Sequence, residues 1–451
     1  MNAVSPRLGG WLIAGFVVVL GGAVAAWLLL TPRALSFAGR HTVSLADYKG
    51  PSPIGVPPEL HSGDVIARGK YLVQAADCKV CHTRVGGEAF AGGRAFETPF
   101  GVLYSPNITA DRESGIGDWS DADFLRAVHE GIAKSGERLY PAFPYESYTL
   151  IADEDVLAIK AYLFSLPVAR ASVPPNNLRF PFNQRWLMGI WAAFYNPDQR
   201  FQPLEDRSPE WNRGAYLVEA LGHCGDCHTP RNVAQAPDNR RKFAGAIVTG
   251  WRAYNITPDP VSGIGTWSDD ELAEYLRSGH AVGHGSAGGP MAEEVAASSS
   301  SLTSGDLHAI VTYLRGIPAV ATPGLPAVKT EAASDSAKLS RATPDPRGTE
   351  IFEGACASCH GWSGASPLTS YATLTGSRAV NDPSAINVAQ IVLSGQGTHL
   401  SERLVRMPAF GGAYSDTEIA AVANYVTARF GAAPSRLTAR DVARLRQFSS
   451  P

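Results

Sequence analysis

The stretch that decides the architecture of this 451-residue chain reads Arg68-Gly-Lys-Tyr-Leu-Val-Gln-Ala-Ala-Asp-Cys78-Lys-Val-Cys81-His82. Its ending recurs twice, so that all six cysteines fall in three Cys-x-x-Cys-His motifs, at Cys78 to His82, Cys224 to His228 and Cys356 to His360. Cysteines three residues apart lie on one face of a helical turn. There each sulfur can form a thioether to one haem vinyl group, while the adjacent histidine offers a nitrogen to the iron.

A Cys-x-x-Cys pair also occurs in zinc sites, redox-active dithiols and ordinary disulfides. Zinc would pair the motifs with one another, and a dithiol does not require histidine in the next position each time. Three motifs with no cysteine left over therefore predict three covalently bound haems c, attached through Cys78, Cys81, Cys224, Cys227, Cys356 and Cys359. The predicted proximal iron ligands are His82, His228 and His360.

The chain around these motifs repeats itself. Arg68-Gly-Lys-Tyr-Leu-Val returns as Arg213-Gly-Ala-Tyr-Leu-Val, and Asn107-Ile-Thr returns as Asn255-Ile-Thr. A third copy opens with Arg347-Gly348. We therefore predict one fold that is duplicated and followed by a shorter copy: a first repeat over residues 61–167, a second over 206–318 and a third over 344–432.

Each repeat ends in an amphipathic helical pattern. Apolar residues recur at spacings of three, six and seven, at Val156 to Leu163, Leu307 to Leu314 and Ile419 to Val426. This spacing is one face of a helix and predicts an all-α fold of three compact domains. A glycine stands eight to ten residues before each first cysteine, and we expect it to let the opening helix approach the closing helix closely: Gly69, Gly214 and Gly348.

Methionine is the residue expected to complete the iron coordination, because a thioether sulfur favours ferrous iron and raises the potential. The chain has only four methionines. Met291 and Met407 both lie downstream of their motifs, in loops before the closing helix. We predict these two as sixth ligands, with core packing as the alternative.

The first repeat departs from this pattern. Counting from Asn107 and Asn255, Phe143 stands where Met291 stands, and phenylalanine cannot ligate iron. The first haem is then five-coordinate or ligated from elsewhere, with His129 the nearest candidate and Met188 a more distant one. An exposed helix histidine and a packing methionine are the alternatives for these two residues. We expect this haem to differ in potential or spin state.

Two further histidines, His280 and His284, lie in the loop that leads to Met291. Their spacing resembles a metal pair, but their position favours a role in shaping the loop around the second haem. They are left outside the predicted set of iron ligands.

The N-terminal segment predicts export. Trp11 to Leu30 contains 20 residues without a charge, long enough as a helix to cross the hydrocarbon layer of about 30 Å. Arg7 and the free amine predict that the N-terminus stays inside and the rest of the chain lies outside. A cleaved signal peptide is the alternative, but its apolar core usually has about 7 to 15 residues. We predict a membrane anchor (or signal) at residues 1–33 and a linker at 34–60.

The remaining segments complete the predicted domain organisation, and the net charge and motifs exclude some classes of function. We predict a bridge at residues 168–205, a linker at 319–343 and a tail at 433–451, whose amphipathic stretch suits either its own domain or a membrane surface. A net charge of -3 gives no reason to expect nucleic acid as a partner. The chain has no dinucleotide fingerprint and no nucleophile elbow, so no catalytic site of its own is expected.

These residues resemble the triple-haem cytochrome c subunits of bacterial membrane-bound dehydrogenases for alcohols, aldehydes and gluconate. The resemblance covers nearly all of residues 61–430. It rests on the three haem motifs, on Pro106-Asn-Ile-Thr, on Leu139-Tyr-Pro-Ala-Phe-Pro-Tyr145 and on Pro181-Phe-Asn-Gln-Arg-Trp-Leu-Met188. Many relatives of this kind carry methionine where Phe143 stands.

The resemblance implies three tandem class I cytochrome c-like domains behind an N-terminal transmembrane helix, on the periplasmic side of the bacterial inner membrane. It implies a catalytic dehydrogenase subunit as partner, of quinoprotein, flavoprotein or molybdenum type. Electrons would leave toward ubiquinone or another respiratory acceptor, with membrane lipid as a further contact. Two other functions stay open: a stand-alone respiratory electron carrier, and a haem enzyme acting at the first haem with His129 or Glu130 as acid/base group.

Overall fold

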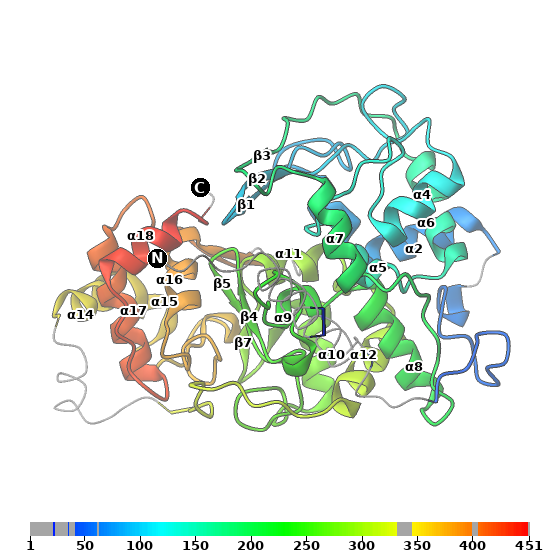
Figure 1. Cartoon of the computed structure of the whole chain (residues 1–451). Helices are drawn as coiled ribbons and strands as arrows, with labels where there is room; N and C mark the ends of the chain where they lie inside the picture. The colour runs from blue at the N-terminus through cyan, green and yellow to red at the C-terminus, as the bar shows by residue number, and fades with distance from the viewer. Residues whose placement is uncertain are drawn as a thin grey trace, which may run out of the picture.

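The chain is described from a computed structural model, shown in Figure 1. It describes residues 21–22, 35, 41–60, 63–331, 345–398 and 405–449. The predicted anchor Trp11 to Leu30 lies outside the described residues, except for Gly21 and Gly22. Within the described ranges, no helix is both long and apolar enough to cross a membrane.

The first repeat follows a short 3₁₀ turn, η2 (Pro58–Leu60). Its elements are α2 (Val65–Ala75), α3 (Cys78–His82), β1 (Ala95–Thr98), β2 (Gly101–Tyr104), α4 (Asp121–Glu130), α5 (Tyr145–Tyr148) and α6 (Asp153–Ser165). The bridge adds β3 (Asn177–Leu178) and α7 (Trp186–Tyr195). The three strands form one antiparallel sheet in which β2 is central.

The second and third repeats also begin and end with a helix and carry the haem motif after the first one. The second contains α8 (Pro209–Tyr216), η3 (Leu217–Leu221), α9 (Gly225–His228), η4 (Asn239–Arg241), β4 (Ala246–Val248), β5 (Trp251–Ala253), α10 (Asp269–Ser278), β6 (His280–Ala281), β7 (Gly285–Ser286), α11 (Pro290–Ala297), η5 (Ser299–Ser301) and α12 (Ser304–Gly316). The third contains α14 (Arg347–Ile351), η6 (Phe352–Cys356), α15 (Ala357–His360), η7 (Ser370–Ala372), α16 (Ile386–Ser394), β8 (Gln396–Thr398), β9 (Val405–Met407) and α17 (Asp416–Phe430), with α18 (Ala439–Arg446) in the tail. In these repeats, η3 and η6 are π-helical turns, and η4, η5 and η7 are 3₁₀ turns.

The fold is largely helical, as predicted, but the described residues also form four small antiparallel sheets, which correct the strict all-α expectation. These strands are two to four residues long and lie in the loops between helices. Segments this short carry too little alternation to be recognised in a sequence. The sheets fix loop conformation and leave the helix packing unchanged.

The opening and closing helices of each repeat pack closely, as the glycines predict. A methyl group added at Gly69 would lie 2.8 Å from the Cβ of Tyr162, and one at Gly214 would lie 2.7 Å from that of Tyr313. The corresponding distance from Gly348 to Tyr425 is 3.1 Å. No larger residue fits at these crossings without moving the helices.

Buried apolar side chains form two clusters where we expected a separate core for each repeat. One cluster runs from Val56 to Ile317 and is shared by the first and second repeats. The other runs from Phe352 to Leu445 and belongs to the third repeat and the tail. Figure 1 shows the same division, with α14 to α18 gathered at one end of the molecule and α8 to α12 beside the first repeat.

In the first two repeats, an arginine of the opening helix pairs with an aspartate of the closing helix. Arg68 Nε donates to Asp155 Oδ1 at 2.9 Å, and Arg213 Nε donates to Asp306 Oδ1 at 2.8 Å. Both aspartates are buried, while the side chains of Arg68 and Arg213 are 31% and 12% exposed, so the second pair has less access to water. A buried pair of this kind fixes geometry more than it adds stability.

The same two aspartates also join the first repeat to the second. Tyr71 Oη donates to Asp306 Oδ2 at 2.6 Å, and Tyr216 Oη donates to Asp155 Oδ2 at 2.7 Å. Each aspartate therefore receives an arginine from its own repeat and a tyrosine from the other. This reciprocity makes the contact a pseudo-two-fold interface, as in an isologous dimer.

The predicted linker at residues 34–60 enters this interface where it is described. The backbone N–H of Gly55 donates to Asp155 at 2.8 Å, and Arg213 donates to the carbonyl oxygen of Gly55 at 2.9 Å. Val56 is buried in the shared core. The segment therefore packs between the first two repeats as well as leading to them.

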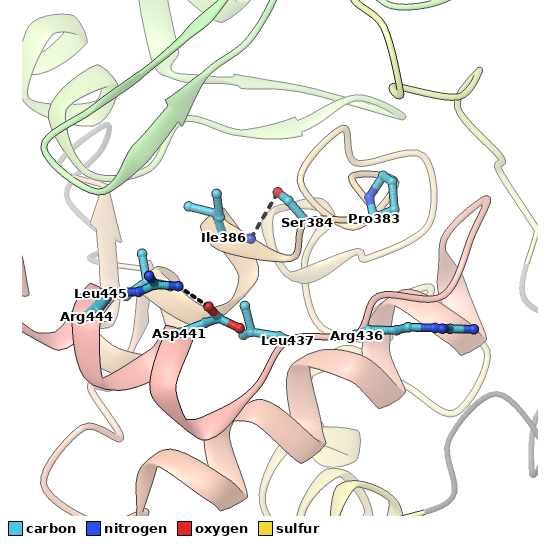
Figure 2. Close-up of a pocket in the computed structure, with 8 residues that line it drawn as sticks. All are labelled: Pro383, Ser384, Ile386, Arg436, Leu437, Asp441, Arg444 and Leu445. Atoms are coloured by element: carbon cyan, nitrogen blue, oxygen red, sulfur yellow. Dashed lines mark hydrogen bonds and ion pairs between the residues drawn. The ribbon is translucent and has the colours of Figure 1, made fainter.

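The tail packs on the third repeat through α18. Val442 and Leu445 are buried in the second cluster, which favours packing over a membrane role for this helix. Figure 2 shows a surface pocket beside α18, in which Arg444 pairs with Asp441. Its lining residues are Pro383, Ser384, Ile386, Arg436, Leu437, Asp441, Arg444 and Leu445.

Candidate haem sites

Each Cys-x-x-Cys-His motif forms a single helical turn: α3, α9 and α15. Burial raises the pKa of the Cys78, Cys81 and Cys227 thiols to about 12 and that of the Cys356 thiol to about 11. Zinc ligation and dithiol chemistry need a thiolate, which a low pKa favours. Across the described part of the chain, no three His, Cys, Asp or Glu side chains meet in an arrangement suited to a metal ion. Burial therefore keeps these thiols neutral, which does not favour dithiol redox chemistry.

The three proximal histidines share one arrangement. The ring nitrogen Nδ1 lies within hydrogen-bond distance of a backbone carbonyl oxygen in every case: His82 on Pro106 at 2.8 Å, His228 on Tyr254 at 2.6 Å and His360 on Ala372 at 2.6 Å. Donation from Nδ1 leaves the lone pair of Nε2 for a metal. Burial lowers the pKa of all three imidazoles and favours the neutral form. The residues present therefore fit covalent haem with histidine ligation.

The repeated Asn-Ile-Thr motif holds the first two of these carbonyl groups. Asn107 accepts a hydrogen bond from the backbone of Thr109 at 2.8 Å and donates to the carbonyl of Ala169 at 2.7 Å. Asn255 makes the same pair of bonds in the second repeat. Each asparagine directly follows the residue whose carbonyl accepts the histidine. Sequence reasoning missed this role, although the repetition of the motif signalled it.

Phe143 and Met291 occupy the same place in their repeats. The backbone N–H of Leu139 donates to Gly131 at 2.8 Å, and that of Ala287 donates to Gly279 at 2.7 Å. Phe143 and Met291 each follow this bond by four residues, so the hairpin register agrees with the count along the sequence. The Phe143 ring packs edge-on against Tyr148, with centroids 5.4 Å apart.

The two predicted methionine ligands lie at the ends of short elements. Met291 is in the first turn of α11, and Met407 is the last residue of β9. Both side chains are half-buried. Their ligation of iron stays a prediction.

His129 is a core histidine. Its side chain is 2% exposed, which overturns the alternative of an exposed helix residue. Nε2 lies 3.0 Å from the carbonyl oxygen of Ile151, and Nδ1 lies 3.8 Å from Asp153. Burial lowers its pKa to about 4. Both ring nitrogens face other partners, so the structure does not favour His129 as an iron ligand. Met188, the other candidate, is half-buried in α7.

The first and second motifs lie side by side across the pseudo-two-fold interface. Arg94 donates to the carbonyl of Val80 in α3 at 2.9 Å and pairs with Glu293 of α11 at 2.6 Å. Tyr148 of the first repeat packs edge-on against His223 of the second, with ring centroids 5.4 Å apart. The loop of Met291 is thereby tied to the first haem motif.

Buried acids line this region. Burial raises the pKa of Asp77 and Glu146 to about 8. It raises the pKa of Glu294 to about 7. Glu146 faces Asp226 and Arg231 of the second repeat, with Arg231 at 3.6 Å. These carboxyl groups titrate close to neutral pH, between the first two motifs.

Comparisons with known proteins agree with this geometry. Residues 66–167 match the cytochrome c family, and residues 344–426 match cytochrome c oxidase, cbb3-type, subunit III. The chain is 38% identical over 401 residues to the fructose dehydrogenase cytochrome subunit of Gluconobacter japonicus, covering 84% of this chain and 82% of the relative. It is 37% identical over 401 residues to the gluconate 2-dehydrogenase cytochrome c subunit of Pantoea cypripedii, covering 85% and 90%.

A longer relative also matches. The chain is 41% identical over 382 residues to a nicotinate dehydrogenase subunit of Pseudomonas putida, covering 82% of this chain and 31% of that protein. The chain thus spans about a third of this relative and most of the other two. With haem-binding turns in place and relatives of this identity over most of its length, the chain belongs to the family of cytochrome c subunits of dehydrogenases, which carry electrons away from a catalytic subunit.

Proposed function

We propose that the chain binds three haems c and relays electrons from a membrane-bound dehydrogenase to ubiquinone or another respiratory acceptor. The dehydrogenase would act on an alcohol, an aldehyde or a sugar acid on the periplasmic side of the bacterial inner membrane. The observation that carries the proposal is the shared Nδ1 contact of His82, His228 and His360 with a backbone carbonyl. This contact presents the same imidazole nitrogen for ligation at all three motifs.

Bound haem would supply a one-electron change at iron, and the chain would supply attachment, axial ligation and surroundings. The cysteines hold each group at a fixed place in the helical turn. Burial of the histidines keeps them neutral and able to ligate, and Met291 and Met407 would complete two of the three sites. No acid or base is needed for the transfer of electrons between such sites.

Membrane attachment rests on the segment Trp11 to Leu30, which lies outside the described residues. The bridge offers a second apolar element. Along α7, Trp186, Ile190 and Phe194 stand four residues apart and are 64%, 52% and 42% exposed. Such a row of large exposed apolar side chains is uncommon on a soluble surface. It supports burial of this helix in the assembled complex, against the dehydrogenase subunit or lipid.

We propose that the first haem differs from the other two in its potential or spin state. Phe143 stands at the methionine position, so this site would lack a thioether ligand unless one comes from elsewhere. The alternative function, a haem enzyme acting at this site, would need acid/base groups above the iron. His129 does not favour it, because its ring is buried against Ile151 and Asp153. Electron relay is therefore the function that the site supports best.

Substrate-driven reduction of haem c in native membranes tests the proposal. Alcohols, aldehydes, fructose, gluconate, nicotinate and purines would be added to membranes of the wild type, a deletion strain and the complemented strain. We expect one substrate class to reduce the haem c band, with loss on deletion and recovery on complementation. Complementation with Cys224→Ala/Cys227→Ala would give no recovery. A band that no substrate reduces would favour the stand-alone carrier or the haem enzyme.

A further inference from the structure

The hairpin formed by β6 and β7 of the second repeat contacts the third repeat, and two of these contacts lead to its predicted iron ligands. We propose that this hairpin, residues 279–287, positions both axial ligands of the third haem, through His280 on the proximal side and Ala287 on the distal side. The inference rests on the proposed three-haem function. It assigns to His280 a role in a different repeat from the one that carries it.

The proximal contact leads from His280 to His360. The imidazole of His280 stacks on the ring of Tyr371, with centroids 4.1 Å apart and an interplanar angle of 24°. Its Nε2 lies 3.1 Å from Ser370 Oγ. Ala372, the residue after Tyr371, supplies the carbonyl oxygen that lies 2.6 Å from Nδ1 of His360. His280 therefore holds the turn η7 that orients the proximal ligand.

The distal contact leads from Ala287 to Met407. The side-chain amide of Gln396 donates to the carbonyl oxygen of Ala287. Gln396 is paired directly with Met407 in the β8–β9 hairpin. The strand that carries the predicted sixth ligand is thereby tied to the same hairpin of the second repeat. Both sides of the third haem site thus depend on residues 279–287.

The hairpin has a fixed shape of its own. Nδ1 of His280 lies 2.9 Å from Ser286 Oγ, and Ala287 donates to Gly279 at 2.7 Å. His280 is 6% exposed, and burial lowers its pKa, which favours the neutral ring. Four residues after Ala287 comes Met291. The hairpin 279–287 therefore directly precedes the predicted sixth ligand of the second site and contacts the residues that support both predicted ligands of the third.

His284 is a matched control in the same hairpin. Its ring stacks on Trp267, with centroids 3.9 Å apart and an interplanar angle of 17°, and its Nε2 lies 3.4 Å from Glu271. Both partners belong to the second repeat. His280 and His284 thus differ in which repeat they contact, while residue type and loop are the same.

The test is a potentiometric titration of the purified, haem-loaded complex, with the ferric haems followed in parallel by electron paramagnetic resonance. Haem c per chain is counted first by the pyridine haemochrome. We expect His280→Ala to move one of the three midpoint potentials and the matching low-spin signal. The other two potentials should stay in place, and His284→Ala should leave all three unchanged. A His280→Ala variant that titrates like the wild type, or moves the same potentials as His284→Ala, would overturn the inference.

Further variants separate positioning from folding. His280→Phe keeps a ring for the stack and His280→Gln keeps a hydrogen-bonding group, so each should restore part of the wild-type potential. Gln396→Ala should move the same single potential by loosening the distal side, and no shift there would overturn the distal contact. If His280→Ala loses haem, the Phe and Gln variants decide the proximal contact in the same way. A wild-type chain without three haems would overturn the proposed function, whereas unshifted variants of a three-haem chain overturn only this inference.

Discussion

The first two repeats and the third repeat are built from the same helices but are joined in different ways. Tyr71 and Tyr216 exchange hydrogen bonds with Asp306 and Asp155 across a pseudo-two-fold axis. In the third repeat, Glu350 stands at the tyrosine position. The third repeat therefore lacks the tyrosine that the reciprocal interface of the first two repeats uses.

The remaining partners in the third repeat have changed accordingly. Arg347 pairs with its neighbour Asp345 at 2.7 Å, on the surface. Glu418, which stands where the aspartates stand, forms a capping box with Ser415 instead. The third repeat attaches to the second through the hairpin 279–287 and through β5, where Arg252 pairs with the buried Asp382 at 2.9 Å, and its core is separate. The difference predicts that the pair and the third repeat respond unequally to matched changes.

The largest effect is expected from Asp155→Ala. The buried aspartate accepts from both Arg68 and Tyr216, and its removal leaves Arg68 without its buried partner. Breaking a fully buried pair costs about 3 to 5 kcal/mol, and we expect the lower end here because Arg68 is 31% exposed and keeps Glu154 at 3.2 Å. Denaturant unfolding of the holoprotein, followed by circular dichroism, should show an early transition for the first two repeats. The control Asp345→Ala removes the surface partner of Arg347 and should leave unfolding unaltered; equal effects of the two variants would contradict the comparison.

The second largest loss of stability is expected from replacing the interface tyrosines, Tyr71 and Tyr216. Tyr71→Phe or Tyr216→Phe removes a hydrogen bond to a charged group, which contributes about 1.5 to 3 kcal/mol. The double variant tests the symmetry, because the two bonds serve one interface and their losses should not simply add. Glu350→Gln, at the same position of the third repeat, is the control. Strict additivity, or an equal loss from Glu350→Gln, would speak against the reciprocal interface.

The helix crossings sharpen the comparison further. Gly214→Ala adds a methyl group 1.9 Å from the carbonyl oxygen of Ala309 and 2.7 Å from the Cβ of Tyr313, so the helices must shift and the cost should be at least about 1 to 3 kcal/mol. Gly348→Ala should cost less, since Tyr425 is farther away at 3.1 Å. Thermal unfolding of each variant gives the ranking. Gly354→Ala, with nothing within 4 Å of the added methyl group, should have no destabilising effect.

Phe143→Met would make the first repeat match the second. The new thioether is expected to ligate the first haem, which raises its potential and strengthens the absorption from sulfur to ferric iron. Met291→Phe is the converse change and should weaken that absorption. The measurement is the ferric spectrum together with a redox titration. An unchanged spectrum after Phe143→Met would mean that the first site already has a strong sixth ligand.

The smallest effect should be a pH dependence confined to the first two haems. Burial raises the pKa of Glu146 to about 8. An ionised carboxylate stabilises ferric iron, so the potential should fall as pH rises through this pKa, by at most about 59 mV per pH unit. Glu146→Gln, with Asp226 and Arg231 left in place, should flatten the curve. A slope that survives this change, or one that belongs to the third haem, would contradict the assignment.

The helical turns that carry the three haem motifs were predictable because their determinants are local. Two cysteines and the histidine after them fall on one helical turn wherever the chain folds. The place of Phe143 followed from a count between two repeats and agrees with the hairpin register. The packing of Gly69, Gly214 and Gly348 also followed from their spacing, since a repeated glycine in a helix marks a close approach.

The contacts between repeats were not predictable in the same way. Tyr71 meets Asp306 across 235 positions, and His280 meets Ser370 across 90. No spacing rule reaches that far along a chain. The burial of His129 was missed because its ring is covered by Ile151 and Asp153, which lie more than 20 positions away along the chain. Internal repetition of the Arg-Gly-x-Tyr motif was a usable signal, but it did not reveal which aspartate each tyrosine would meet.

The covalent haem content of the purified chain tests the central claim most directly. Intact mass after acid extraction of free haem would be measured together with the pyridine haemochrome, on the wild type and on variants that lack one motif. The account predicts three haems retained per wild-type chain and two in each variant. Fewer than three in the wild type, or haem that is removed by extraction, would contradict it.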